Sequence, residues 1–185
     1  MNTQEFRNVL GSFVTGVTVI TAVDEAGYRL GVTVNSFTSL SLDPPLILWC
    51  QSLAAASHAR FRTVKRFNVN VLSAEQLDIS RRFAGGSGPK FDAVECDFAM
   101  NGSPLIKGAV AYLECTMHAQ IPGGDHMIFV GKVEKVSRTP RPPLLFGMGR
   151  YLLAHPHYSG SAIAEDQGER HARRVVQPWI EDSGP

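Results

Sequence analysis

The chain is poor in the features that mark secreted, membrane-bound and nucleic-acid-binding proteins. Its 3 cysteines among 185 residues have no CxxC spacing, which argues against a disulfide framework or zinc site and favours a reducing cytoplasm. No apolar run approaches the roughly 20 residues that a membrane helix needs. The formal net charge is only +1 and the N-terminus MNTQEFRNVLGSF has no secretion-signal pattern. We therefore expect a cytoplasmic protein without a membrane or nucleic-acid partner.

The sequence also lacks the patterns of most catalytic centres. His155 and His157 form an HxH pair without a third ligand at a recognisable spacing, so no metal site is predicted. No nucleophile, paired carboxylates or internal repeats stand out. With 44% hydrophobic residues, the chain is long enough for one compact domain, which we place at residues 1–154, followed by a polar tail at residues 155–185.

Alternating and β-branched segments predict a mainly β fold. Strands are expected at residues 17–23, 28–34, 46–50, 67–72, 110–121 and 126–136, with a short last strand at 144–151. The first two segments should form a hairpin, and so should 110–121 with 126–136. Helices are expected at residues 3–14 with Thr3 as cap, from the segment 51–56 to about residue 66, and from a capping box at Ser73 to about Phe83.

The segment 31–49, GVTVNSFTSLSLDPPLILW, is unusually rich in small hydroxyl side chains. It begins as a strand and then turns stiffly at the double proline, since proline restricts its own backbone and that of the preceding residue. Short side chains, hydroxyl groups and a rigid frame suit a flat ligand with polar edges, such as the isoalloxazine ring of a flavin. The alternative is an ordinary strand, loop and strand, because hydroxyl-rich loops are common.

Three further features are candidates for ligand contacts. Ser52 and Ser57 bracket the expected start of a helix, where backbone amides favour a phosphate, although either serine could be only an N-cap. The loop AGGSGPKF carries Lys90 and could close over a phosphate, or could be an ordinary surface loop, since its glycines fit no nucleotide fingerprint. His126 stands at the mouth of a hairpin, where it can reach a ligand or remain a surface residue.

Six segments occur in an order and spacing that resemble one known family: FRNVLGSFVTGVTVIT, GVTVNSFTSLSLDPPL, FNVNVLSAEQ, RFAGGSGPKF, GSPLIKGAVAYLEC and GGDHMIFVGKV. From about residue 6 to 151, the chain resembles the flavin reductases of two-component monooxygenase systems. The resemblance implies a split β-barrel of Greek-key type with flanking helices. It also implies a homodimer with flavin held near the subunit interface.

The resemblance further implies roles for particular residues. The family's ring-binding strand, phosphate-binding helix entry, phosphate or adenine end and final Gly-x-Tyr correspond to predicted cofactor-binding residues Thr33, Val34, Asn35, Ser36, Ser39, Ser41, Ser52, Ala56, Ser57, Phe83, Lys90 and Tyr151. The histidine of the GDH motif, near the nicotinamide ring, corresponds to His126, the predicted catalytic residue. The chain departs from the pattern at Gly147 and Met148, where relatives often carry an aromatic residue and an arginine, at the glycine-rich loop 84–89, and in the tail.

The implied activity is transfer of a hydride from NADH or NADPH to FMN or FAD, with reduced flavin supplied to a partner monooxygenase. Such an oxidoreductase needs little side-chain chemistry, because the cofactors carry it and the protein stacks their rings. The alternatives are an oxidase of the pyridoxamine-phosphate-oxidase type on bound FMN, a flavin carrier or sensor without turnover, and a β-barrel interaction module. The sequence leaves FMN against FAD and NADH against NADPH open.

Overall fold

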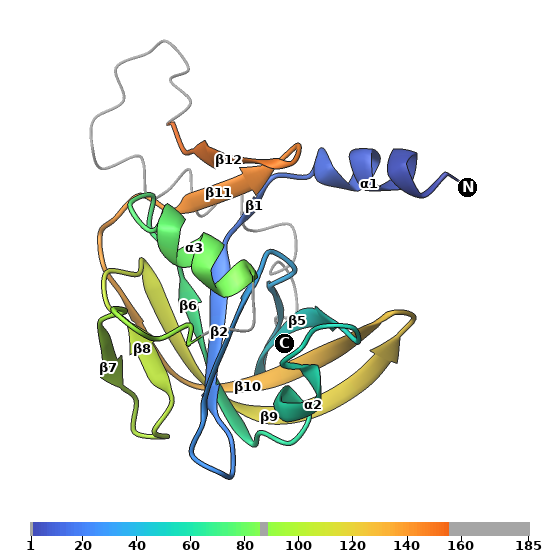
Figure 1. Cartoon of the computed structure of the whole chain (residues 1–185). Coiled ribbons are helices and arrows are strands. Elements are labelled where there is room, and N and C mark those ends of the chain that lie inside the picture. The colour runs from blue at the N-terminus through green and yellow to red at the C-terminus, as the bar shows by residue number, and fades with distance from the viewer. Residues whose placement is uncertain (1, 86–88, 156–185) are drawn as a thin grey trace, which may run out of the picture. The chain divides into compact units, whose positions relative to one another are not determined.

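A seven-stranded antiparallel sheet dominates the computed structural model, which describes residues 2–85 and 89–155 (Figure 1). The strand order is β3-β2-β6-β9-β10-β5-β4. The bounds are β2 (Thr18–Val23), β3 (Arg29–Val34), β4 (Thr38–Leu42), β5 (Pro45–Ser52), β6 (Arg66–Val71), β9 (Ala111–Gly123) and β10 (His126–Arg138). The predicted mainly β fold and both predicted hairpins, β2 with β3 and β9 with β10, are confirmed.

Two smaller sheets and three helices complete the unit Met1–Ala154. One sheet has the order β1-β11-β12 and the other pairs β7 with β8. Their bounds are β1 (Thr15–Gly16), β11 (Leu144–Gly147), β12 (Arg150–Leu153), β7 (Cys96–Phe98) and β8 (Pro104–Ile106). The helices are α1 (Thr3–Gly11), α2 (His58–Phe61) and α3 (Leu77–Ala84). Except for His155, the predicted tail lies outside the described residues.

The end strands of the large sheet, β3 and β4, are consecutive in the chain. Only residues 35–37 connect them, and an extended chain spans no more than about 3.5 Å per residue. The sheet must therefore curve until its two ends approach each other. Ser36 lies in this connection, and its hydroxyl bonds to the backbone of Cys50 in β5.

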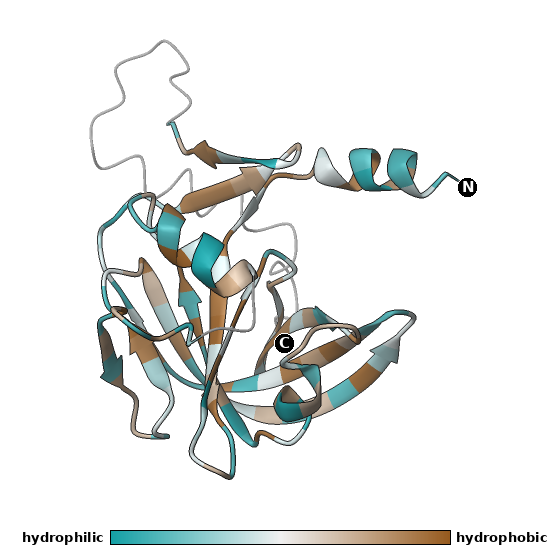
Figure 2. Cartoon of the chain, viewed as in Figure 1, coloured by the Kyte–Doolittle hydropathy of each residue, from teal (hydrophilic) through white to brown (hydrophobic). Residues whose placement is uncertain are grey.

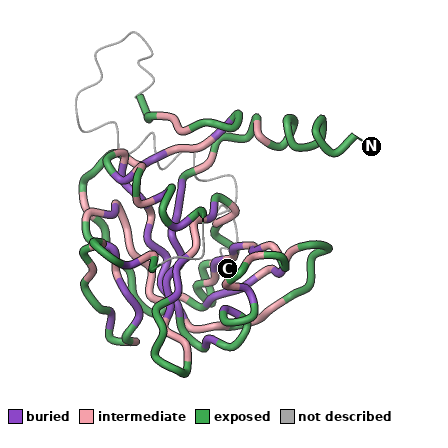
Figure 3. Tube along the Cα trace, in the orientation of Figure 1, coloured by how far each residue is buried: buried purple, intermediate pink, exposed green. Residues whose placement is uncertain are grey.

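The core has two apolar clusters. Many hydrophobic strand segments are brown in Figure 2, and many buried ones are purple in Figure 3. In the first, Trp49 stacks on Phe129 with ring centroids 4.4 Å apart and meets Phe61 edge to face. The second lies between α3 and the sheets and includes Leu72, Phe83, Phe91, Ile106 and Leu144. This second cluster fixes α3 against the strands.

The polar face of β6 is also buried. Asn68 and Asn70 are 0% exposed because β8 and the residues before it cover them. Asn68 donates to the carbonyls of Ser103 and Pro104, and the Asn70 side-chain oxygen accepts the backbone N–H of Ile106 at 2.8 Å. The two amides thus anchor the β7–β8 hairpin to the main sheet, since buried polar groups need partners.

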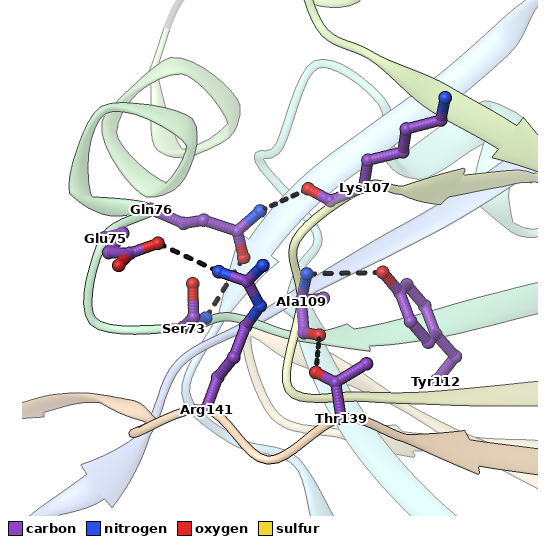
Figure 4. Close-up of polar contacts among 8 residues, drawn as sticks. All are labelled: Ser73, Glu75, Gln76, Lys107, Ala109, Tyr112, Thr139 and Arg141. Carbon is purple, nitrogen blue, oxygen red and sulfur yellow. Dashed lines mark hydrogen bonds and ion pairs between the residues drawn. The ribbon is translucent and has the colours of Figure 1, made fainter.

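Helix α3 begins at Leu77 with Gln76 as its N-cap and has no side-chain capping bond, so the capping box predicted at Ser73 is wrong. Residues 73–76 instead form a turn before the helix (Figure 4). The Gln76 side chain accepts the backbone N–H of Ser73 at 3.0 Å and donates to the carbonyl of Lys107 at 2.8 Å. The Ser73 hydroxyl, by contrast, is buried without a hydrogen-bond partner among the described residues. Nearby, Arg141 pairs with Glu75 at 3.0 Å. The bond from Gln76 to the Lys107 carbonyl ties the start of α3 to the segment that follows β8.

Two predicted helices differ from the structure. Helix α1 is capped by Asn2, not Thr3, because the Asn2 side chain accepts the N–H groups of Gln4 and Glu5. The helix expected to reach residue 66 has only the four residues of α2. It ends early because Val64 turns into the core and the carbonyl of Lys65 pairs with Met117 beside β9.

The expected last strand at 144–151 is a hairpin of two strands, β11 and β12. Met148 and Gly149 form its tip with φ angles of 51° and 73°. Two successive positive φ angles are what a tight hairpin turn of this type requires. The glycine at position 149 was the available signal for this turn.

Candidate functional site

A small cavity of about 160 Å³ opens where β3, α3 and the β11–β12 hairpin meet. Its polar lining is held by hydrogen bonds between these elements. The Thr33 hydroxyl donates to the carbonyl of Ser80 at 2.7 Å, and the hydroxyls of Ser80 and Tyr151 lie 3.0 Å apart. The lining residues are Val17, Thr33, Val34, Asn35, Ser80, Ala84, Phe146 and Tyr151.

A larger cavity of about 740 Å³ borders the same strand closer to its start. Its walls come from the β2–β3 turn, β3, the segment before α2, Arg60 of α2, the end of α3 and residues 89–92. Among the described residues, the cationic side chains of Arg29, Arg60 and Lys90 and the carboxylate of Asp92 line it. Asp24, behind the wall, also pairs with Arg60 at 3.5 Å, so the lining keeps a net positive charge. The cavity is thus suited to an anionic group.

The cations of the large cavity rest mainly on aromatic rings. The guanidinium of Arg29 lies 5.2 Å from the centroid of Phe91, and that of Arg60 lies 4.7 Å from the centroid of Tyr28. Both distances are within cation–π range. Lys90 donates to the carbonyl of Phe83 at 3.1 Å, and burial lowers the pKa of its ammonium group.

The two cavities follow each other along β3. Leu30, Gly31 and Val32 line the large one, Thr33 and Val34 line the small one, and Ala84 of α3 borders both. Gly31 allows this wall to form, because a Cβ at that position would overlap the ring of Phe83. The cavities are therefore successive parts of one surface on β3.

Eight predicted cofactor-binding residues are brought together by this surface. The small cavity collects three residues of the predicted ring-binding strand and the final tyrosine: Thr33, Val34, Asn35 and Tyr151. The large one collects three residues of the predicted phosphate end, Ala56, Ser57 and Lys90, and also Phe83. The ring of Phe83 is fully buried, so it supports the cavity wall from behind.

The remaining predicted serines line neither cavity. The hydroxyl of Ser36 accepts the N–H of Cys50 at 2.9 Å and donates to its carbonyl at 3.1 Å, so it is committed to β5. Ser39 and Ser41 lie on β4 at the far end of the sheet. The Ser52 hydroxyl accepts the N–H of Ala54. The long helix predicted after Ser57 is wrong, because α2 has only four residues. A helix this short has too small a dipole to favour a phosphate at its start.

His126 begins β10, paired in the sheet with Ser52 and Gly123, and lines neither cavity. Its side chain is 45% exposed, with Nδ1 2.7 Å from a carboxylate oxygen of Asp125. This hydrogen bond lowers the pKa of Asp125. The pair is therefore an accessible polar group at the tip of the β9–β10 hairpin.

Sequence reasoning missed many residues of the surface, among them Ser80, Tyr28, Arg29 and Arg60. Ser80 had a usable signal, since its spacing from Gln76 and Phe83 places it on the buried face of α3. Tyr28, Arg29 and Arg60 had none, because they come from segments that only the fold brings together.

Metal ligands and membrane helices are not found in the described part of the chain. Among residues 2–85 and 89–155, no three His, Cys, Asp or Glu side chains gather as a metal site would require. His157 of the HxH pair lies outside these residues. None of the described helices has the length and apolar character needed to cross a membrane.

The mainly β unit has a hydroxyl-lined cavity that leads along one strand into a cationic one, an arrangement suited to a planar, anionic ligand. Comparison with known proteins narrows the class of protein. Residues 10–153 match the family model described as flavin reductase like domain. The chain belongs to this family.

Named relatives and solved structures agree with this assignment. The chain is 42% identical over 150 residues to the FMN reductase (NADH) SmoA of Agrobacterium fabrum, covering 81% of this chain and 85% of that one. It is 39% identical over 179 residues to HsaB, a flavin-dependent monooxygenase reductase subunit of Mycobacterium tuberculosis, covering 95% of each. The structure of the NADH:FAD oxidoreductase of Streptomyces globisporus is similar, with TM-score 0.81, 42% identity and coverage of 85% and 95%. The chain spans only 55% of the length of a probable flavin reductase of Rhizobium meliloti, 39% identical over 172 residues.

Proposed function

We propose that this chain is an NAD(P)H-dependent flavin reductase that passes a hydride from a nicotinamide to FMN or FAD and supplies reduced flavin to a partner monooxygenase. Family membership over residues 10–153 supports this. So do relatives named as an FMN reductase (NADH) and a monooxygenase reductase subunit. These names favour the reductase over the oxidase alternative and NADH as the donor. The observation that carries the proposal is that predicted ring and phosphate residues line successive cavities on β3.

The residues of the chain bind and orient in this proposal. Flavin and nicotinamide supply the redox chemistry when bound, so no side chain need form a covalent bond. Thr33, Val34 and Asn35 hold the polar edge of the ring system, with Tyr151 fixed beside them through Ser80. The residues proposed to bind the flavin phosphate are Ala56, Ser57 and Lys90. Phe83 supports these contacts from within the core.

We assign the remaining predicted residues to a homodimer. Helix α1 has 9 residues and no buried one, which is visible in Figure 3, and isolated helices under about 12 residues are marginal in water. Its apolar side chains need a partner surface, and a second copy can supply one. Exposed apolar residues also lie on β4. The apolar residues that we assign to the dimer interface are Phe6, Val9 and Leu10 of α1 and Leu40 and Leu42 of β4.

In that dimer, His126 of one copy would line the nicotinamide side of the other copy's site, with Ser39, Ser41 and Ser52 near the interface. Ser36 holds the β3–β4 connection. His126 is exposed enough for such a contact. His126→Ala is expected to raise the KM for NADH while leaving the flavin Kd unchanged. An unchanged KM and turnover would remove His126 from the site.

The dimer itself is tested by light scattering on the full chain. Val9→Glu together with Leu10→Glu should convert dimers to monomers, because two charges would enter an apolar interface. Gln4→Glu on the same helix is the matched control and should leave the dimer intact. A wild-type monomer would refute this part of the proposal.

The activity is tested by mixing purified protein with NADH or NADPH and with FMN or FAD in the four pairings. With oxygen excluded, a reductase bleaches the nicotinamide band and the flavin band together, whereas in air oxygen reoxidises the flavin and only the nicotinamide band is lost. Steady absorbance in all four pairings would identify a carrier without turnover. Protein with NADH alone serves as the control for a tightly bound flavin.

The proposal also covers organisation and location. We assign residues 1–154 to a split-barrel flavin reductase domain and residues 155–185 to a polar tail. The curved large sheet, whose end strands are joined by residues 35–37, supports the split-barrel assignment. A cytoplasmic location follows from the cysteine usage described above.

A further inference from the structure

The large cavity extends beyond the groups placed at the phosphate. Ser57 and Lys90 account for one anionic group, yet the cavity measures about 740 Å³ and continues to Tyr28, Arg29 and Arg60. Cavities of roughly 300 to 1,000 Å³ hold whole small molecules. The three additional residues therefore lie where a second group of the ligand can bind.

Their chemistry combines flat surfaces with positive charge. Arg29 and Arg60 each lie over an aromatic ring, at 5.2 Å and 4.7 Å from its centroid. Tyr28 is a large aromatic side chain that is 59% exposed at the cavity rim. Guanidinium planes and aromatic faces bind a heteroaromatic base by stacking, and guanidinium groups also pair with phosphate.

Asp24 holds two of these residues in place. One of its carboxylate oxygens accepts the backbone N–H groups of Ala26 and Tyr28 at 3.0 Å and 2.9 Å. The other lies 3.5 Å from a guanidinium nitrogen of Arg60, and the Asp24 side chain is only 10% exposed. The β2–β3 turn and the α2 arginine are thus fixed relative to each other before any ligand binds.

We propose that Tyr28, Arg29 and Arg60 form a subsite for an adenylate group, which reaches it as half of a dinucleotide. This inference rests on the proposed function and names a substrate class for it. FMN bound with its phosphate at Lys90 would leave the subsite empty, whereas the adenylate of FAD would fill it. If FAD supplies the adenylate, the chain binds FAD more tightly than FMN. The adenylate of the nicotinamide dinucleotide is the other possible source of the same group.

The test compares Tyr28→Ala and Arg60→Met with the wild-type chain. Each variant should raise the Kd for FAD, measured by flavin fluorescence, about tenfold, the order expected for loss of one base-stacking contact. The Kd for FMN should change less than twofold. Arg62→Met, an exposed arginine that lines neither cavity, is the matched control for lost charge and should change neither. Thermal unfolding of every variant checks the fold, and Tyr28 is exposed enough that its replacement keeps the test valid if Arg60→Met unfolds.

Two further measurements complete the test. The first identifies which dinucleotide supplies the adenylate, and the second tests the subsite independently of the proposed function. A raised KM for NADH with FMN as acceptor would support the subsite and assign it to the nicotinamide dinucleotide. Calorimetric binding of 5′-AMP, lost in both variants, tests the subsite without turnover, so it stands even if the reductase activity fails. Equal weakening of FMN and FAD, or no effect on any adenylate ligand, would overturn the inference.

Discussion

The two cavities share strand β3 but hold their polar groups in different ways. In the small one, the hydroxyls of Thr33, Ser80 and Tyr151 are linked across three elements by directional hydrogen bonds. In the large one, cations lie over aromatic rings, and only Lys90 is bonded to the backbone. Hydrogen bonds fix position within tenths of an ångström, whereas charge attraction acts over longer distances and less directionally. Orientation and affinity are thus supplied by different parts of one surface.

The largest effect is expected from truncating Phe83, because both cavities border the strand that this ring supports. Phe83→Ala removes a fully buried ring that lines the large cavity and packs against Gly31 of β3, the strand that both cavities border. Such truncations cost about 3 to 5 kcal/mol of unfolding free energy. Urea denaturation measures the loss. Phe98→Ala, at a ring that is 61% exposed on β7, should change stability by no more than about 0.5 kcal/mol. Similar losses for the two variants would contradict the assigned role of Phe83.

A smaller effect is expected from filling the space in front of that ring. Gly31→Ala places a methyl group where the Phe83 ring lies, and overpacking of this kind costs about 1 to 3 kcal/mol. Flavin binding should weaken as well, because both cavities border this strand. At Gly16 an added Cβ meets nothing within 4 Å, so Gly16→Ala is the control. Equal thermal shifts for the two variants would show that Gly31 is not packed as described.

The hydrogen-bonded cavity can be tested by a double-mutant cycle. Tyr151→Phe leaves the fully buried Ser80 hydroxyl without its partner, at a cost of about 1 kcal/mol. Adding Ser80→Ala should restore most of this loss, since no unpaired group then remains. Thermal denaturation of the four proteins measures the coupling. Additive losses would mean that the two hydroxyls do not interact.

The smallest effect concerns the charge on Lys90. Because burial lowers the pKa of this ammonium group, it loses its proton at a lower pH than an ordinary lysine does. The charged form exists below that pKa, so FMN affinity should begin to fall at a lower alkaline pH than expected for an unperturbed lysine. Lys90→Arg keeps its charge and should remove this dependence. Titrations of FMN affinity against pH in both proteins test this, and identical profiles would exclude Lys90 as the phosphate partner.

Local patterns predicted most strands but not which of their faces are covered. The alternation in FNVNVL correctly predicted β6, yet Asn68 and Asn70 read as a polar face and are fully buried. The residues that cover them come from the segment between α3 and β9, far along the chain. Periodicity describes one element, whereas burial depends on what packs against it.

For the site too, the sequence predicted individual segments but not which of them the fold brings together. The composition of the segment 31–49 suggested a flat ligand, and the family resemblance assigned Thr33, Val34 and Asn35 to it. The hydroxyl of Ser36 belongs to the same motif but is used by β5, which no local pattern reveals. Arg29 and Arg60 line the same cavity only because the β2–β3 turn folds beside α2.

Strand β3 stands at one end of the large sheet and is hydrogen-bonded to a neighbouring strand on one side only. End strands open locally more easily than strands such as β6, which pairs on both sides. The backbone amides of Gly31 and Val34 should therefore exchange with deuterium faster than those of β6 in the free protein. Ligand occupancy will slow that exchange, so this strand can report binding without any assay of turnover.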